Sequence, residues 1–280
     1  ISNKKIKKNN RVLKILNIDI AISILNKNII FIIATPPNTH YLILKKIINN
    51  GFNVLVEKPI LLKSYQINKL LEIKNKNYFY ECFMYKYNIS YKILYQQIIK
   101  NYNKISSINI NFLIPPLFYK SFRSLKKFKG TVIYDIGCYV VSLINELNIK
   151  IKKIKILKIN YKYIENKENI EILFYGINFN IYVNIGYSQF YKNDLELVLN
   201  KNNKICFEKI FYGKASYKNI FYVKNDKKNK QTIKDINSFE KMFSLKENVF
   251  RNKFKQNCNI IRKNIIMLEK LIKQYINFNK

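Results

Sequence analysis

The sequence predicts an α/β protein with a parallel sheet first and a large, open, mainly antiparallel sheet after it. Between residues 28 and 85, buried runs such as "NIIFIIAT" and "FNVLVEKP" alternate with helical patterns, at the spacing of βαβ units. From about 151 to 224, short runs rich in Ile, Tyr, Phe and Val are broken by "YGIN", "NKNN" and "KNDKKNK". Such runs are typical of antiparallel strands with one wet, lysine-rich face.

The first part begins with an expected basic helix at 3–16 and a short strand or turn at 18–24. The strand at 28–35 should stop at Pro36 and Pro37, because proline has no N–H to give to a sheet. Asn38 or Thr39 is the expected N-cap of the next helix, which Gly51 closes. The remaining elements expected here are a strand at 52–58, a helix around 62–76 and a strand at 78–85.

The character of the chain changes after residue 88. We expect a helix near 89–101, the strand "SSININFLI", a loop through 115–130 and a helix starting near Thr131 to Asp135. The segment 260–276 has the periodicity of an amphipathic helix. We therefore place a domain boundary at 88/89 and allow for the helix 260–276 to pack back on the first domain.

Composition restricts the partners. The 51 Lys and Arg exceed the 17 Asp and Glu, giving a formal charge of +34. The excess is nearly all lysine and is spread along the chain with Asn, Ile, Tyr and Phe, as an AT-rich genome would produce, so we expect no nucleic-acid partner. The longest apolar run, "IIFIIA", is far shorter than a membrane span. With no secretory leader and four scattered cysteines, the protein is expected to be cytoplasmic, without a metal site or disulfides.

Chemistry-bearing residues follow the predicted strands. Lys58 in "VLVEKP" and the "ATPPNTH" loop at 34–40 lie at carboxyl ends of neighbouring parallel strands, where such sheets bind ligands. "DIGCY" adds Asp135 and Tyr139, four residues apart and on one face if helical. Taken singly, Tyr139 could serve only packing, Asp135 could cap a helix, and His40 could anchor a helix start.

Together these stretches resemble the Gfo/Idh/MocA family of NAD(P)-dependent oxidoreductases. The motifs "ATPPNTH", "VLVEKP", "ECFMYKYN", "SFR" and "DIGCY" occur in the family's order, and the likeness runs from residue 1 to about 275. "FLIPP" and "DIGCY" look like the nucleotide-sugar 3-ketoreductase and dihydrodiol dehydrogenase-like branch. The resemblance implies a Rossmann domain over 1–88 and a substrate-binding and oligomerisation domain over 89–280.

The resemblance also implies site residues. Tyr139 would be the proton donor and acceptor, Lys58 would stabilise the substrate oxyanion, and Asp135 would orient the substrate or the lysine. The implied cofactor-binding residues are Ser2, Thr35, Pro36, Asn38, His40, Glu57, Lys58 and Pro59. The implied substrate-binding residues are Lys86, Arg123 and Asp135. The substrate would be a sugar or nucleotide sugar, and the family's habit implies a dimer or tetramer formed through the open sheet.

The glycine-rich GxGxxG segment of the family is missing, so the Rossmann domain is expected to be incomplete. The chain is then either a fragment of a longer product, which the Ile1 start favours, or a remnant that lost its dinucleotide site. Ser2 stands where NAD enzymes carry an acid, and Lys4 and Lys5 would accept a 2′-phosphate, which slightly favours NADP over NAD. The alternative function is a catalytically inactive binding or assembly protein with the same fold.

Overall fold

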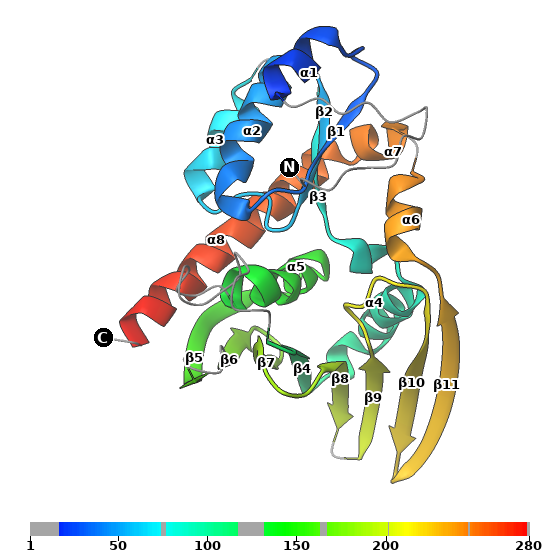
Figure 1. The fold of residues 1–280 in the computed structure, drawn as a ribbon. Helices are drawn as coiled ribbons and strands as arrows, with labels where there is room; N and C mark the ends of the chain where they lie inside the picture. The colour runs from blue at the N-terminus through cyan, green and yellow to red at the C-terminus, as the bar shows by residue number, and fades with distance from the viewer. Residues whose placement is uncertain are drawn as a thin grey trace.

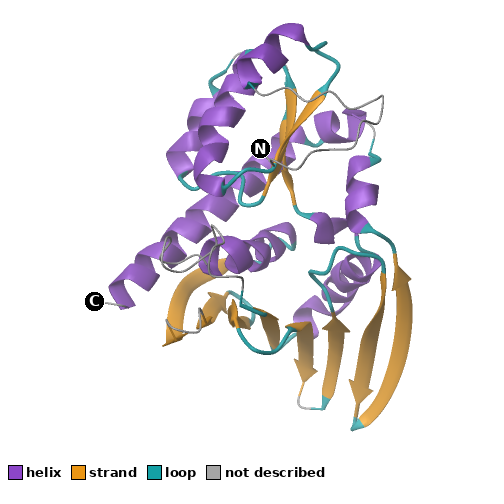
Figure 2. Ribbon diagram, in the orientation of Figure 1, coloured by secondary structure: helices purple, strands orange, loops and turns teal. Residues whose placement is uncertain are grey.

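Two sheets, each packed against helices, form the molecule (Figures 1 and 2). The computed structural model describes residues 17–73, 77–116, 132–162, 167–200, 202–245 and 247–278. The first sheet is parallel, and the second is larger and mainly antiparallel. The predicted fold class is therefore confirmed.

The smaller sheet contains β1 (Ile30–Ile33), β2 (Asn53–Glu57) and β3 (Phe79–Cys82), in that order. β2 lies in the centre, and its first four residues are buried; the apolar run Val54–Val56 predicts this burial. The crossovers contain helices α2 (Pro37–Asn49) and α3 (Ser64–Leu71). Because both pairings are parallel, the ends of β1 and β2 lie at the same edge of the sheet.

The larger sheet has the order β11-β10-β9-β8-β4-β7-β6-β5. Neighbours are antiparallel except β4 and β7, which pair in parallel. Side chains alternate along each strand: Ile110 and Val183 face the helices, whereas Asn109 and Tyr182 lie on the other face. The strands are β4 (Ser107–Ile114), β5 (Ile151–Lys162), β6 (Lys167–Gly176), β7 (Asn180–Tyr187), β8 (Lys192–Asn200), β9 (Asn203–Glu208), β10 (Ser216–Lys224) and β11 (Lys227–Asp235).

Helices cover one face of the larger sheet and leave the other open (Figure 1). α4 (Ile89–Asn101), α5 (Cys138–Glu146) and α8 (Phe254–Phe278) all contribute to the core over this sheet. α8 also supplies Ile261 and Ile265 to the core of the smaller sheet, so it packs against both parts. The other helices are α1 (Ile18–Ile24), α6 (Ser238–Phe243) and α7 (Glu247–Asn252). Among the described residues, no helix is both long and apolar enough to cross a membrane.

Several local predictions were wrong. Residues 18–24 form helix α1 instead of a strand or turn, because the Asn17 side chain accepts the Asp19 N–H and caps the helix. α2 begins at Pro37 after Pro36 and has no side-chain cap, since the fixed φ of proline suits a first helical turn. The strand expected at 78–85 ends at Cys82 and continues as a 3₁₀-helix, Met84–Tyr87.

In the second half, the helix expected near Thr131 to Asp135 begins with a π-helical turn, Ile133–Gly137. The antiparallel region extends past 224, because the Lys-rich "KKNKQTIKD" forms edge strand β11. The last helix is longer than 260–276 and spans Phe254–Phe278. The expected helix at 3–16 lies outside the described residues.

Candidate functional site

Lys58 follows β2 directly and contacts the second half of the molecule. Its ammonium donates to the Asp135 carboxylate oxygen Oδ1 at 2.8 Å and to the Asp135 carbonyl oxygen at 2.6 Å. Both side chains are only 9% exposed, so the ion pair is largely shielded from water. An ammonium has three N–H donors, and Asp135 occupies two, which leaves one for a ligand oxygen.

The loop that carries Lys58 is held from two sides. The buried ring of His40 lies between two backbone carbonyls, with Nε2 2.7 Å from Thr35 O and Nδ1 3.0 Å from Pro59 O. The buried Glu81 carboxylate accepts the Ile60 N–H at 2.9 Å. His40 therefore links the end of β1 to the loop after β2, and its ring nitrogens face the backbone.

Tyr139 lies in the first turn of α5, directly after the π-helical turn that carries Asp135. The Lys58 ammonium is 4.7 Å from the centre of its ring, within the range of a cation–π interaction. The Tyr139 hydroxyl donates to the Met84 sulfur at 3.6 Å, and a thioether is a weak acceptor. The ring packs edge-on or tilted against four other aromatic rings, those of Phe83, Tyr85, Phe112 and Phe211.

A cavity of about 290 Å³ joins these groups. Glu57, Lys58, Asp135 and Tyr139 provide its polar lining, and Phe112 and Phe239 provide apolar walls. The site thus combines an ammonium, a carboxylate and a phenol beside aromatic surface, as ligand pockets commonly do.

Burial and charge shift the pKa values in opposing ways. Burial lowers the pKa of Lys58, but the nearby Tyr139 and Asp135 raise it more, so the pKa lies above its ordinary value. Burial raises the pKa of Tyr139, and Lys58 only partly offsets this rise. At neutral pH, Lys58 is therefore a cation and Tyr139 a neutral proton donor.

The other predicted site residues are distributed unevenly. Thr35 is half-buried, with its hydroxyl 2.7 Å from that of Thr39, whereas Pro36 and Asn38 are exposed at the start of α2. Lys86 forms an ion pair with Glu146 at the end of α5, and neither lines the cavity beside Lys58. The predicted residues Ser2, Lys4, Lys5 and Arg123 lie outside the described residues.

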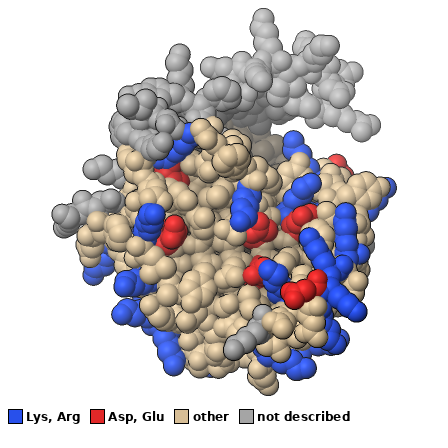
Figure 3. All heavy atoms as spheres, turned by 90° about the horizontal axis from the view of Figure 1, so that it is seen from below, with Lys and Arg blue, Asp and Glu red and all other residues tan. Residues whose placement is uncertain are grey.

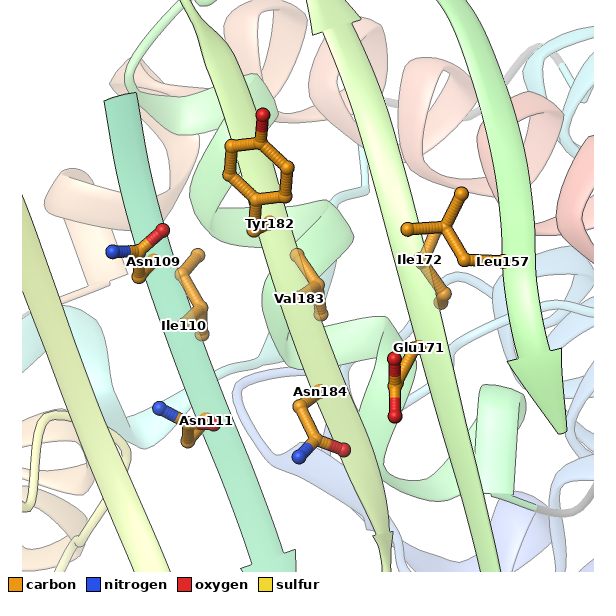
Figure 4. A pocket seen from close by; sticks show the side chains of 9 residues that line it. All are labelled: Asn109, Ile110, Asn111, Leu157, Glu171, Ile172, Tyr182, Val183 and Asn184. Carbon is orange, nitrogen blue, oxygen red and sulfur yellow. The ribbon is translucent and has the colours of Figure 1, made fainter. Parts of the chain in front are cut away.

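A second hollow, of about 250 Å³, lies on the open face of the larger sheet (Figure 4). Its lining comes from β4, β5, β6 and β7, and it includes Asn109, Asn111, Glu171, Tyr182 and Asn184. In this view the helices lie behind the sheet. The hollow is therefore on the opposite face from the Lys58 cavity.

Residues 10–80 match the model of the oxidoreductase family with an NAD-binding Rossmann fold, GFO_IDH_MocA. The resemblance to the Gfo/Idh/MocA family is confirmed. The match covers the smaller sheet up to the start of β3, including the "ATPPNTH" and "VLVEKP" motifs of the family.

Solved structures share the fold over most of the chain. A variant of KijD10, a 3-ketoreductase from Actinomadura kijaniata in complex with TDP-benzene and NADP, superposes with a TM-score of 0.72 and 14% identity, covering 87% of this chain and 77% of that one. Aldose-aldose oxidoreductase from Caulobacter crescentus superposes with a TM-score of 0.75 and 11% identity, covering 93% of this chain and 80% of that one. UDP-N-acetylglucosamine 3-dehydrogenase GnnA from Acidithiobacillus ferrooxidans superposes with a TM-score of 0.68 and 12% identity, covering 93% of this chain and 82% of that one. A comparison of the sequence with curated proteins finds no match.

The matching family model describes an NAD-binding Rossmann fold, and the KijD10 structure was solved with NADP. The "ATPPNTH" and "VLVEKP" loops lie at the same edge of the smaller sheet, beside the cavity that Lys58 lines. Asp135 accepts two hydrogen bonds from the Lys58 ammonium, so its third N–H is available to a ligand. Nothing among the described residues forms a glycine-rich phosphate loop, so we assign no residue to the diphosphate.

Sequence reasoning missed the apolar walls and the supports of the site. Phe112 and Phe239 line the cavity, and Met84 accepts from Tyr139. Tyr187 donates its hydroxyl to the second Asp135 oxygen, Oδ2, at 3.1 Å. The period-2 pattern of β7 places Tyr187 on the helix-facing side, but no local signal pairs it with Asp135.

Proposed function

We propose that this protein is an NAD(P)-dependent oxidoreductase that transfers a hydride between nicotinamide and a carbonyl or hydroxyl carbon of a sugar or nucleotide sugar. The observation that carries this proposal is the placement of Lys58, Asp135 and Tyr139 around one cavity, at the strand edge where open parallel sheets bind ligands. The three side chains come from "EKP" and "DIGCY", which lie far apart in the sequence.

Each residue has a defined task in carbonyl reduction. NAD(P)H, when bound, supplies the hydride to the carbonyl carbon. Tyr139 donates its phenolic proton to the carbonyl oxygen, and its raised pKa keeps that proton in place until charge develops on the oxygen. Lys58 directs its remaining N–H at the same oxygen and stabilises the developing negative charge, while Asp135 holds the lysine. In the oxidation direction Tyr139 would act as its phenolate, which Lys58 stabilises, and would take up the substrate hydroxyl proton as the hydride leaves the carbon for NAD(P)⁺.

The proposed substrate class rests on the size and walls of the cavity and on the similar proteins. Phe112 and Phe239 offer apolar surface to a sugar ring. Structural neighbours include a 3-ketoreductase crystallised with TDP-benzene and a UDP-N-acetylglucosamine 3-dehydrogenase. NADP stays slightly favoured over NAD, on the basis of the sequence around Lys4 and Lys5.

The first test is a fluorescence titration with NADPH and NADH, followed by a turnover screen with nucleotide sugars. We expect binding with NADPH preferred, and turnover that Tyr139→Phe lowers by about 10²–10⁴-fold, the contribution typical of a positioned proton donor. Tyr95→Phe, at an exposed position on α4, serves as the control. Dinucleotide binding without turnover would favour the alternative, a non-catalytic binding protein. Absence of binding both by this chain and by a version extended upstream in its gene would contradict the proposal.

We further propose that the open face of the larger sheet joins two copies of the chain into a dimer or tetramer. Tyr182 and Leu157 are exposed there, and the Asn184 side-chain oxygen is buried without a hydrogen-bond partner among the described residues. Seen from below, Lys and Arg side chains lie mostly toward the margin of the molecule, with fewer Asp and Glu among them (Figure 3).

Analytical ultracentrifugation tests this interface. Tyr182→Lys should convert the oligomer to a monomer, because it adds a charge to the lining of the hollow on this face. Tyr95→Lys, on the helix-covered side, should leave the oligomer intact. A wild-type chain that sediments as a monomer would contradict the proposal.

A further inference from the structure

Tyr187 is a buried tyrosine at the end of a strand whose other helix-facing side chains are aliphatic. Ile181, Val183 and Ile185 precede it on the same face of β7, and Tyr187 is only 1% exposed. A buried phenol requires a hydrogen-bond acceptor, since an unsatisfied hydroxyl is costly. Its acceptor is Asp135 Oδ2, at 3.1 Å.

Asp135 is thereby bound at both carboxylate oxygens. Oδ2 accepts from Tyr187, and Oδ1 accepts from the Lys58 ammonium at 2.8 Å. A carboxylate hydrogen-bonded at one oxygen cannot rotate freely, so the Tyr187 hydroxyl fixes the orientation in which the carboxylate meets the lysine. Hydrogen bonds to charged groups are also among the stronger ones in proteins.

The backbone around this contact is closely packed. A Cβ atom on Gly137 would lie 3.1 Å from Cδ1 of Ile185, so glycine lets the π-helical turn approach β7. Ile185 and Tyr187 are two residues apart and on the same face, which places the turn directly over both. Tyr187 itself does not line the Lys58 cavity.

We propose that Tyr187 is a positioning residue that fixes the Asp135 carboxylate and, through it, holds the Lys58 ammonium at the cavity. The chain of contacts runs from the larger sheet, through the π-helical turn, to the end of β2. The role in catalysis rests on the proposed oxidoreductase function, whereas the fixing of Asp135 does not depend on it.

The kinetic test uses Tyr187→Phe, which removes the hydroxyl and keeps the ring. We expect kcat to fall about tenfold, because one hydrogen bond to a charged group is lost, with KM for the dinucleotide unchanged. In a Lys58→Met background, Tyr187→Phe should cause no further loss, since Tyr187 acts through the lysine. An unchanged kcat, or an equal loss in both backgrounds, would overturn the proposal.

A second test needs no cofactor and no turnover. Tyr187→Phe should lower the melting temperature by about 2–4 °C in the wild-type background, and by clearly less in an Asp135→Ala background, where the hydrogen bond to Asp135 Oδ2 is absent. A purely packing role would lower it equally in both. If the wild-type protein shows no turnover but Tyr187→Phe lowers the melting temperature only when Asp135 is present, the proposed function is refuted. The fixing of Asp135 by Tyr187 would still be supported. If Asp135→Ala does not fold, the kinetic test decides alone.

Discussion

Two lysine–aspartate ion pairs in this molecule have nearly the same length and opposite surroundings. Lys58 and Asp135 are 2.8 Å apart and border a cavity, with 9% of each side chain exposed. Lys218 on β10 and Asp235 on β11 are 3.0 Å apart and fully buried. The first pair joins the smaller sheet to the π-helical turn, and the second joins two neighbouring strands.

The two pairs differ in the other groups that surround each charge. Burial lowers the pKa of Lys218, and Asp235 does not fully offset it, whereas Tyr139 and Asp135 raise the pKa of Lys58 despite burial. Asp235 also accepts from Ile89 N and Ser90 Oγ at the start of α4, so its oxygens are committed to holding that helix. Pair geometry alone therefore does not separate a structural ion pair from the catalytic one that we propose at Lys58. The proposed difference is that Lys58 borders a cavity and has an N–H that Asp135 does not use.

The largest effect is expected for Lys218→Met. It leaves the Asp235 carboxylate buried without its cation, which typically costs about 3–5 kcal/mol of the free energy of unfolding. Urea unfolding measures the loss. Turnover per folded molecule should stay at the wild-type value, and a large fall in kcat would break the distinction between the two pairs.

Lys58→Met should have the converse effect. Turnover should fall by about 10²–10³-fold, as expected when a donor that stabilises an oxyanion is removed. The free energy of unfolding should change by less than about 2 kcal/mol, because Asp135 keeps the Tyr187 hydrogen bond and borders the cavity. Steady-state kinetics and urea unfolding of the same preparation give both numbers. A large loss of the free energy of unfolding with unchanged turnover would show that the Lys58–Asp135 pair is structural.

A smaller effect is expected when the aspartate of each pair is neutralised after its lysine has been removed. In Lys218→Met, adding Asp235→Asn should restore most of the lost stability, since the amide oxygen still accepts the Ile89 N–H and no unpaired charge remains. In Lys58→Met, adding Asp135→Asn should not restore turnover, because the ammonium is still missing. Restored turnover in that double variant would show that Lys58 is not needed for its charge.

The smallest effect is a difference in pH dependence. The pKa of Lys218 is lowered on folding, so the unfolded chain binds more protons between that pKa and the unfolded value of about 10.4. The stability of the wild type relative to Lys218→Met should therefore rise with pH in this window. The pKa of Lys58 is raised, so its contribution is constant below about 10.4 and is lost only above it. Urea unfolding from pH 7 to 10 should show that the stability difference between the wild type and Lys218→Met rises with pH. The difference between the wild type and Lys58→Met should stay constant over the same range.

Much of the fold follows from local sequence. The unbroken apolar run of β2, the alternation in β4 and β7 and the amphipathic pattern of α8 each identify their element, because burial on two faces, one face or one stripe demands those patterns. Boundaries were less predictable. α1 depends on a cap at Asn17, which is one side chain, and the periodicity of residues 18–24 is too short to show it.

The sequence by itself determined the resemblance to the Gfo/Idh/MocA family and the placement of "EKP" at a strand end, because both are properties of contiguous residues. Only the tertiary structure decided that Asp135, 77 positions away, holds Lys58, and that Tyr187 holds Asp135. It likewise placed Phe239 in the cavity wall and paired Lys86 with Glu146. The physical reason is that hydrogen bonds and ion pairs act over a few ångströms, and packing of the two sheets and their helices determines which distant residues come that close.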